Sequence, residues 1–173
     1  MRASVICEIF NSGVGGRYGT VICGGRDEPL FLPRCDSLDE IYFTNNYASS
    51  ALHEIAHWCL AGAARRKIID YGYWYKEKRT AEEQLQFESL EIRPQALEWI
   101  FSEAAGVRFR VSLDNFERMS GDCFEFRASV REEARNLAHL VNKRASLFLS
   151  DLLSVTGNKK VFLPETFEEI PGC

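Results

Sequence analysis

The sequence predicts an α+β fold, in which a small mixed or antiparallel sheet packs on helices within a single domain over residues 1–173. The chain has the length of one ordinary domain, and its 46% hydrophobic and 27% charged residues are typical of a globular protein. Short strand-like segments come first and longer segments with helical periodicity follow. The chain lacks the strand–helix alternation of a doubly wound sheet.

The expected strands lie in the N-terminal third. Residues 5–10 are short and apolar, and they fit either a strand or the first turn of a helix. Residues 18–23 form a strand pattern that the following glycine pair ends. Residues 30–32 lie between two prolines, which indicates an edge strand, and residues 41–43 predict another short strand.

Three helical segments are expected further along. Residues 47–64 have apolar side chains at helical period, with either Asn45 or Asn46 as the N-cap. Residues 81–105 predict a helix interrupted at Pro94, and residues 129–155 predict one long helix with a single apolar face.

The remaining segments are shorter. Aromatic residues 71–75 indicate a strand or pocket wall, and the charged residues 76–79 a turn. Residues 109–113 fit a further strand. The tail after Thr156 carries two prolines and predicts irregular structure along the surface.

Composition argues against several classes of protein. The formal net charge of −4 and pI of about 5.5 disfavour direct nucleic-acid binding, which requires a basic surface. No apolar run reaches the roughly 20 residues of a membrane helix, and the N-terminus has no signal-like segment. Six scattered cysteines without a C-x-x-C pair predict reduced, buried thiols. We therefore expect a cytoplasmic monomer.

The run His53-Glu54-Ile55-Ala56-His57 is an H-E-x-x-H motif inside the first long helix. Residues four apart lie on one helical face, so both imidazoles can point at one metal ion. Glu54 lies beside them and can reach a metal-bound water. The remaining histidine, His139, stands alone in a helical pattern and is interpreted as structural.

A third ligand is expected from the following helix. Glu88 and Glu91 lie on neighbouring faces of that helix, and we favour Glu91 as the ligand while leaving Glu88 open. Gln95 follows Glu91 by one turn, and its amide can support a ligating histidine.

Two imidazoles and one carboxylate fit two chemistries. With Zn²⁺ they form the site of a metallopeptidase, in which the metal activates water and Glu54 is the base. With Fe(II) they form the facial triad of non-haem oxygenases, which leaves positions for O₂ and substrate. The ligand types alone do not decide between them.

Four segments resemble the bacterial elongation factor P hydroxylase family: HEIAHWCLAGAARRKIIDYGYWY at residues 53–75, QFESLEIRPQALEW at 86–99, RDEPLFLP at 26–33 and VSLDNFE at 111–117. The similarity covers about residues 5–120. It implies a metal-dependent enzyme with Fe(II) and O₂ that hydroxylates the β-lysylated lysine of elongation factor P, a translation factor. The family's metal set carries over onto His53, His57 and either Glu91 or Glu88, on a zincin-like helix.

Candidate substrate-binding residues follow from the charge of such a side chain. Acidic and aromatic residues near the motif can receive its cationic tip. The basic run 65–67 has two interpretations. Its cations either stabilise the C-terminus of the motif helix through the helix dipole, or they dock an acidic face of the partner protein. In a hydroxylase, Glu54 would orient an imidazole, tune bound water or meet the substrate ammonium. The candidates are Arg65, Arg66, Asp70, Tyr73 and Glu88.

Overall fold

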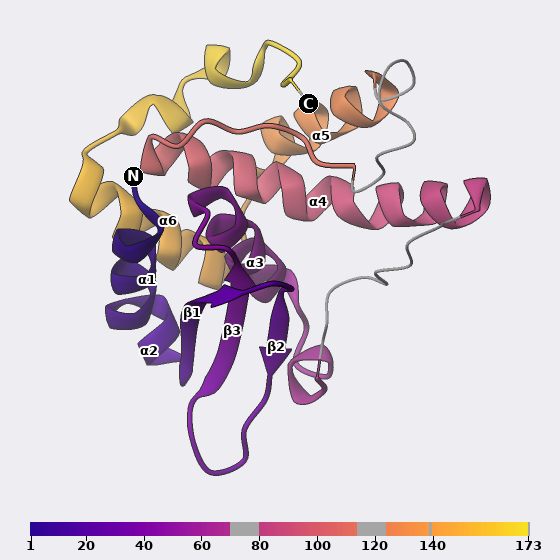
Figure 1. The fold of residues 1–173 in the computed structure, drawn as a ribbon. Helices are drawn as coiled ribbons and strands as arrows, with labels where there is room; N and C mark the ends of the chain where they lie inside the picture. Colours follow the sequence, from indigo (N-terminus) through magenta and orange to yellow (C-terminus); the bar gives the residue numbers. More distant parts are fainter. Residues whose placement is uncertain (70–79, 114–123, 139, 173) are drawn as a thin grey trace.

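The computed structural model describes residues 1–69, 80–113, 124–138 and 140–172 (Figure 1). The expected strand at 71–75 and turn at 76–79 lie outside these residues, as does His139. The described part confirms a mixed α+β architecture with one small sheet. Among the described residues, no helix combines the length and apolarity that crossing a membrane requires.

The chain begins with a helix. Helix α1 spans Ala3–Ser12 and the short α2 spans Val14–Arg17, so the strand alternative for residues 5–10 was wrong. Ile6, Ile9 and Phe10 are all buried, and their i, i+3, i+4 spacing explains the helix because it places the three side chains on one face.

Three strands form the sheet in the order β1-β3-β2, with bounds Thr20–Arg26 for β1, Leu30–Leu32 for β2 and Asp39–Thr44 for β3. Strand β1 runs parallel to the central β3, and β2 runs antiparallel to it at the predicted edge position. The sheet is therefore mixed, as expected.

Strand β1 does not end at its glycine pair, contrary to expectation. A side chain at Gly24 would lie 2.7 Å from the Phe43 ring, and Gly25 has a φ of 92°. The register with β3 shifts between Cys23 and Arg26. The glycines thus allow an irregular continuation of the strand where bulkier residues would clash.

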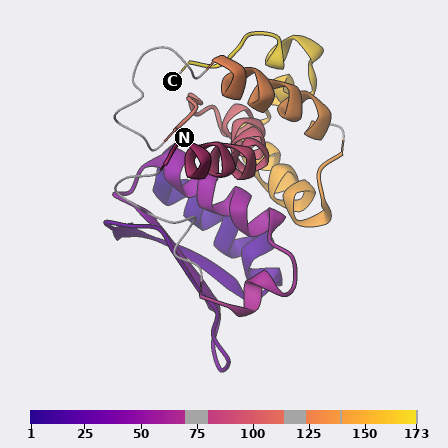
Figure 2. The same cartoon turned by 90° about the vertical axis from the view of Figure 1, so that its right-hand side faces the viewer.

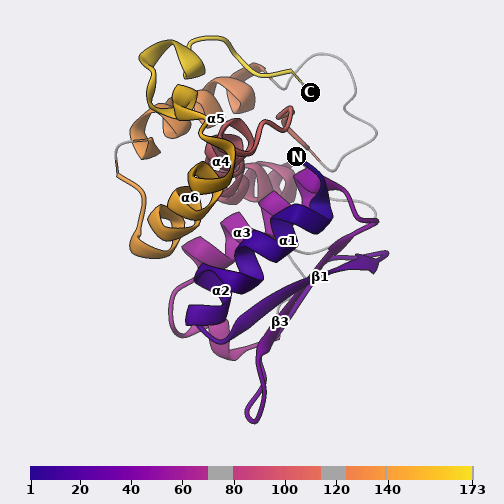
Figure 3. The same cartoon turned by 90° about the vertical axis from the view of Figure 1, so that its left-hand side faces the viewer.

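Helices α1 and α3 lie side by side on one face of the sheet (Figures 2 and 3). Helix α3 spans Ala48–Leu60, shorter than predicted, and its N-cap is Tyr47. Asn45 and Asn46 adopt left-handed conformations, with φ of 48° and 59°, so they form the turn into the helix and not its cap.

The C-terminal end of α3 is held by side chains from elsewhere. Asn142 Nδ2 and Arg144 Nη2 donate to the Cys59 carbonyl at 2.8 and 2.9 Å, and Arg66 Nη1 donates to the Ala61 carbonyl at 2.8 Å. Arg66 belongs to a separate 3-10 turn, η1 (Arg65–Lys67), which follows the helix. These donors satisfy backbone carbonyls that have no partner within the helix. The positive charges of Arg144 and Arg66 also stabilise the negative end of the helix dipole.

Helix α4 (Ala81–Ala105) crosses the centre of the molecule (Figure 1). Thr80 and Glu83 form a capping box at its start, and Gly106 ends it in a left-handed conformation. The helix continues through Pro94, so the expected interruption was wrong. Its boundaries otherwise match the prediction.

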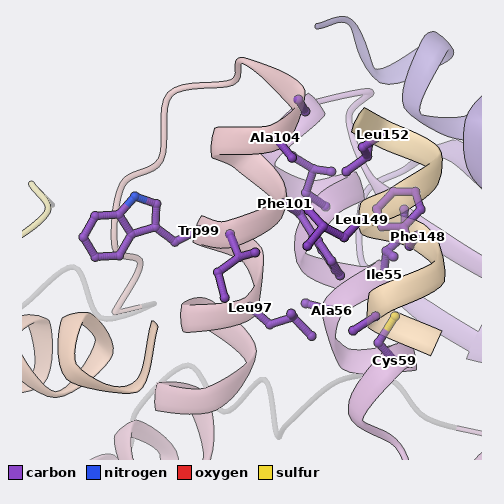
Figure 4. Packing of buried hydrophobic residues seen from close by; sticks show 14 of the residues in the cluster. Ile55, Ala56, Cys59, Leu97, Trp99, Phe101, Ala104, Phe148, Leu149 and Leu152 are labelled. Atoms are coloured by element: carbon purple, nitrogen blue, oxygen red, sulfur yellow. The ribbon is translucent and has the colours of Figure 1, made fainter. Parts of the chain in front are cut away.

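The main core lies between α3, α4 and α6 (Figure 4). Helix α3 contributes Ile55, Ala56 and Cys59, whereas Trp99 of α4 points away from this contact. On the far side of α4, the Trp99 ring stacks on Phe109 with centroids 5.3 Å apart. The other labelled core residues are Leu97, Phe101, Ala104, Phe148, Leu149 and Leu152.

The long C-terminal helix predicted over 129–155 is two helices, α5 (Phe124–Leu137) and α6 (Lys143–Thr156). Asn142 separates them because its side chain accepts from the Ala145 N–H and caps α6. The tail forms two 3-10 turns, η3 (Lys159–Phe162) and η4 (Pro164–Phe167).

Two further expectations need correction. Residues 109–113 are not a strand; the Val111 N–H instead donates to the Gly172 carbonyl. Cys59 is buried as expected, but Cys23 and Cys35 are exposed. The described cysteines are free thiols, whereas Cys123 and Cys173 lie outside the described residues.

Candidate metal centre

His53 and His57 project from one face of α3, one turn apart, and Glu91 of α4 faces them. Their Nε2 atoms are 3.0 Å apart. Glu91 Oε1 lies 3.2 Å from His57 Nε2, and Glu91 Oε2 lies 3.6 Å from His53 Nε2. The three potential ligand atoms lie within 4.8 Å of one another, an arrangement that can hold a divalent cation.

The packing of α3 against α4 creates this arrangement. Leu52, Ile55 and Ala56 are fully buried and fix the orientation of α3, so the two imidazoles emerge at the edge of the core. Glu91 is only 3% exposed. A carboxylate so enclosed is costly unless it is paired with donors or a cation, and here the two imidazoles lie within pairing distance of it.

Glu91, and not Glu88, belongs to this cluster. Glu88 lies one turn earlier and accepts a hydrogen bond from Gln84 Nε2 at 2.9 Å. Because Glu91 lies on the helical face that packs against α3, its carboxylate comes within ligand distance of both imidazoles.

Gln95 supports the carboxylate and not a histidine, which corrects the expectation. Its Nε2 lies 3.4 Å from Glu91 Oε2 and donates to the Ser112 carbonyl at 2.7 Å. The Ser112 N–H in turn donates to Gln95 Oε1 at 3.1 Å. The amide is therefore fixed by the backbone of the segment after α4, and it orients Glu91.

Glu98 is a further residue of the site, and its contact with His53 was not predicted from the sequence. Its Oε2 accepts from His53 Nδ1 at 2.9 Å, and its side chain is only 8% exposed. In the neutral imidazole, which is the form that binds a metal, a proton held on Nδ1 leaves the Nε2 lone pair facing Glu91 and His57. Glu98 comes two helical turns after Glu91, and this spacing on one face was the available signal.

The electrostatics of the cluster favour a positive charge. Desolvation acts to raise the pKa of Glu91, but hydrogen bonding by His57 and the charges of both imidazoles lower it to about 2. Desolvation acts to lower the pKa of His53, but Glu98 and Glu91 raise it to about 10. Burial raises the pKa values of Glu54 and Glu98 although the nearby imidazoles oppose this, so Glu91 is the carboxylate that keeps its negative charge most firmly.

Two recesses meet at this cluster, and Glu54 and His57 line both. One, the metal recess, also contains His53, Glu91 and Glu98. The second extends past Trp58 and Leu60 to the η1 turn. Glu54 is thus placed where a substrate atom near the ligand cluster would meet it.

The candidate substrate-binding residues fall into three groups. Arg65 and Arg66 line the second recess, although not on a continuation of α3, because the helix ends at Leu60. Glu88 lines neither recess in the described part of the chain. Asp70 and Tyr73 lie outside the described residues.

The fold and the site together define an α+β protein with a candidate mononuclear metal centre of two histidines and one glutamate. Residues 9–165 match the family described as elongation factor P hydroxylase. The elongation factor P lysine hydroxylase of Haemophilus influenzae is 46% identical over 133 residues, which cover 75% of this chain and 75% of that protein. The chain belongs to the elongation factor P hydroxylase family, and it is an enzyme of the protein-lysine hydroxylase class.

Proposed function

We propose that this enzyme hydroxylates a lysine side chain of elongation factor P, after that lysine has received a β-lysyl group. The substrate is taken from the family and from the name of the Haemophilus influenzae relative. The observation that carries the proposal is the convergence of His53, His57 and Glu91 within 4.8 Å, because hydroxylation of an unactivated carbon requires a reactive metal centre.

We infer that these three residues hold one Fe(II) ion and that O₂ is the co-substrate. Two histidines and one carboxylate with open coordination positions are the ligand set of non-haem iron oxygenases, and the iron would supply the oxygen chemistry. The protein's own contribution is geometric: Glu98 fixes the His53 ring, and Gln95 fixes the Glu91 carboxylate.

The metal recess suits the proposed side chain. A lysyl-lysine is long and cationic, and the recess presents Glu54, Glu91 and Glu98. We propose that Glu54 meets the substrate ammonium or tunes bound water, because it lies beside the ligands without being one of them. The enzyme would work in the cytoplasm as a monomer, on the intact factor.

Docking of the factor against Arg65 and Arg66 stays a prediction. Charge reversal at both positions should weaken catalysis on the intact factor, more strongly at low salt, because exposed charges are screened over about 10 Å at 0.1 M. Metal content should not change. Equal turnover of a short β-lysylated peptide would argue against docking.

A zinc hydrolase on a zincin-like helix is the alternative chemistry. It is favoured by the position of Glu54 beside His57, where a peptidase would have its general base. Metal analysis separates the two: iron with O₂-dependent activity supports the hydroxylase, and tight zinc with peptide cleavage supports the hydrolase.

The decisive experiment is mass spectrometry of elongation factor P from cells that carry or lack this gene. We expect the modified lysine to gain the mass of one oxygen atom only when the wild-type gene is present. His53→Ala and His57→Ala should abolish both metal binding and this gain, whereas Arg34→Gln, which removes an exposed ion pair with Glu40, should not. An unchanged mass in the wild-type strain would refute the proposal.

A further inference from the structure

The second recess beside the metal centre has a chemistry of its own. Its volume is about 340 Å³, within the range of small-molecule sites. Arg65 and Arg66 line it from the η1 turn, and Arg93 lines it from α4. We name it the arginine recess after these three side chains. It opens onto Glu54 and His57, which it shares with the metal recess.

The two recesses carry opposite charge. Among the described residues that line the metal recess, three carboxylates, those of Glu54, Glu91 and Glu98, lie with the Arg110 guanidinium and the imidazoles of His53 and His57. Among the described residues that line the arginine recess, three guanidinium groups stand against one carboxylate, that of Glu54, while Arg93 also pairs with Glu133 outside the recess. A cationic lysyl side chain is therefore drawn to the metal recess and repelled from the arginine recess, so the latter is built for a ligand of negative charge.

Two of these guanidinium groups, those of Arg66 and Arg93, keep donors for such a ligand beside the contacts they already make. Arg66 uses Nη1 for the Ala61 carbonyl, and Arg93 Nε lies 3.5 Å from Glu133 Oε1. A guanidinium has five N–H donors, so one contact leaves most of its capacity. Because the groups come from two elements, they can approach an anion from two sides, and the planar fork of arginine matches a carboxylate.

The rest of the lining is apolar. Phe31 of β2, the buried Trp58 of α3 and Leu90 of α4 all contribute to it. A purely inorganic anion would leave this surface without a partner, whereas a short carbon chain would cover it. This combination of cations and apolar wall selects a small organic acid.

We propose that the arginine recess binds a small aliphatic carboxylate, held by Arg65, Arg66 and Arg93 with its carbon chain against Trp58 and Leu90. The site is distinct from the metal recess, which receives the lysyl side chain of the protein substrate. Its ligand sits next to His57 and Glu54, close enough to enter or leave in step with the reaction. The proposal concerns binding and does not depend on which metal the centre holds.

The test uses succinate as probe and succinamide as its neutral isostere, with the full-length protein. Calorimetry gives the dissociation constant, and ¹H–¹⁵N spectra report on the arginine Nε–H groups and the Trp58 indole. We expect succinate to bind and to shift the Trp58 indole signal, and succinamide not to bind. Arg65→Gln with Arg93→Gln should raise the succinate Kd by about tenfold or more, because charge-assisted hydrogen bonds are lost.

Two variants separate this site from its neighbours. Arg110→Gln removes a cation from the metal recess and should leave the succinate Kd within about twofold, because its charge is not in the arginine recess. His53→Ala disrupts the metal centre and should leave succinate binding in place. Loss of binding in His53→Ala would assign the carboxylate to the metal and overturn the proposal.

Other outcomes also decide it. Equal binding of succinate and succinamide would overturn the proposal, as would a double variant that binds succinate like wild type. If the double variant loses affinity for elongation factor P while wild type binds no succinate, the recess is a docking surface for the protein partner. Because binding is measured without the factor, hydroxylation of the factor can stand or fall independently of this result.

Discussion

Glu98 offers the sharpest test of how the metal centre is built. Its carboxylate accepts from His53 Nδ1 at 2.9 Å and is nearly buried. Glu98→Gln keeps the side-chain volume and an acceptor oxygen but removes the charge. Glu98→Ala removes the acceptor altogether, so His53 loses both its orientation and the contact that keeps its proton on Nδ1 and its Nε2 lone pair toward the metal.

The magnitude follows from this contact. A hydrogen bond to a charged group contributes about 1.5 to 3 kcal/mol. If this free energy serves to orient a metal ligand, its loss lowers the metal affinity by a factor of about 10 to 100, since each 1.4 kcal/mol is tenfold. We expect a loss of about tenfold for Glu98→Gln, which retains a neutral acceptor, and of about a hundredfold for Glu98→Ala.

The assay is competition for the metal against a chromophoric chelator, with thermal unfolding to verify that each variant is folded. Glu88→Gln is the matched control, because Glu88 is on the same helix but outside the ligand cluster. A Glu98→Ala protein that is folded and binds metal within about threefold of wild type would refute this role for Glu98.

Three further outcomes are expected. Glu91→Gln should lose most metal binding and activity, whereas Glu88→Gln should keep both; the reverse result in metal analysis would make Glu88 the ligand. Glu54→Gln should lower the rate of hydroxylation by less than about a thousandfold, since a direct proton-transfer role would cost more. Burial raises the pKa of the Cys59 thiol, so little reactive thiolate is present and iodoacetamide should label exposed Cys35 well before Cys59. Peptide mass spectrometry that shows equal labelling of the two would contradict the packing of α3.

The sequence predicted those parts of the fold that depend on local pattern. The helix with the H-E-x-x-H motif, the edge strand and the stop at Gly106 all follow from residues close together in the chain. The prediction of one helix over residues 129–155 was wrong because the apolar face keeps its period across the break between α5 and α6. The cap at Asn142 marks that break. The helical spacing of Ile6, Ile9 and Phe10 was present, but so short a segment also fits a strand.

The site was partly predictable for the same reason. His53 and His57 are fixed by their spacing on one helix, whereas the choice between Glu88 and Glu91 depends on which face of α4 meets α3. That choice depends on tertiary packing, which cannot be read from the local pattern of a single sequence. The role of Glu98 needed the same information, because its partner lies 45 residues away in the chain.

Helix α4 explains why activity and packing are joined in this protein. Four of its five buried polar residues, Gln84, Glu91, Gln95 and Glu98, recur at helical spacing along its length. Each of these is normally costly to bury, and a stripe of them would destabilise an ordinary core helix. Here the stripe faces the imidazoles of α3 and the segment that contains Ser112, and the hydrogen bonds described above satisfy much of it. The apolar face of the same helix packs against α3 and α6, so the contact that stabilises the fold also sets the distance between Glu91 and the histidines (Figure 4). A change that shifts α4 by even part of a turn would therefore disassemble the site before it unfolded the protein, because residue spacing on a helix moves every side chain of the stripe together.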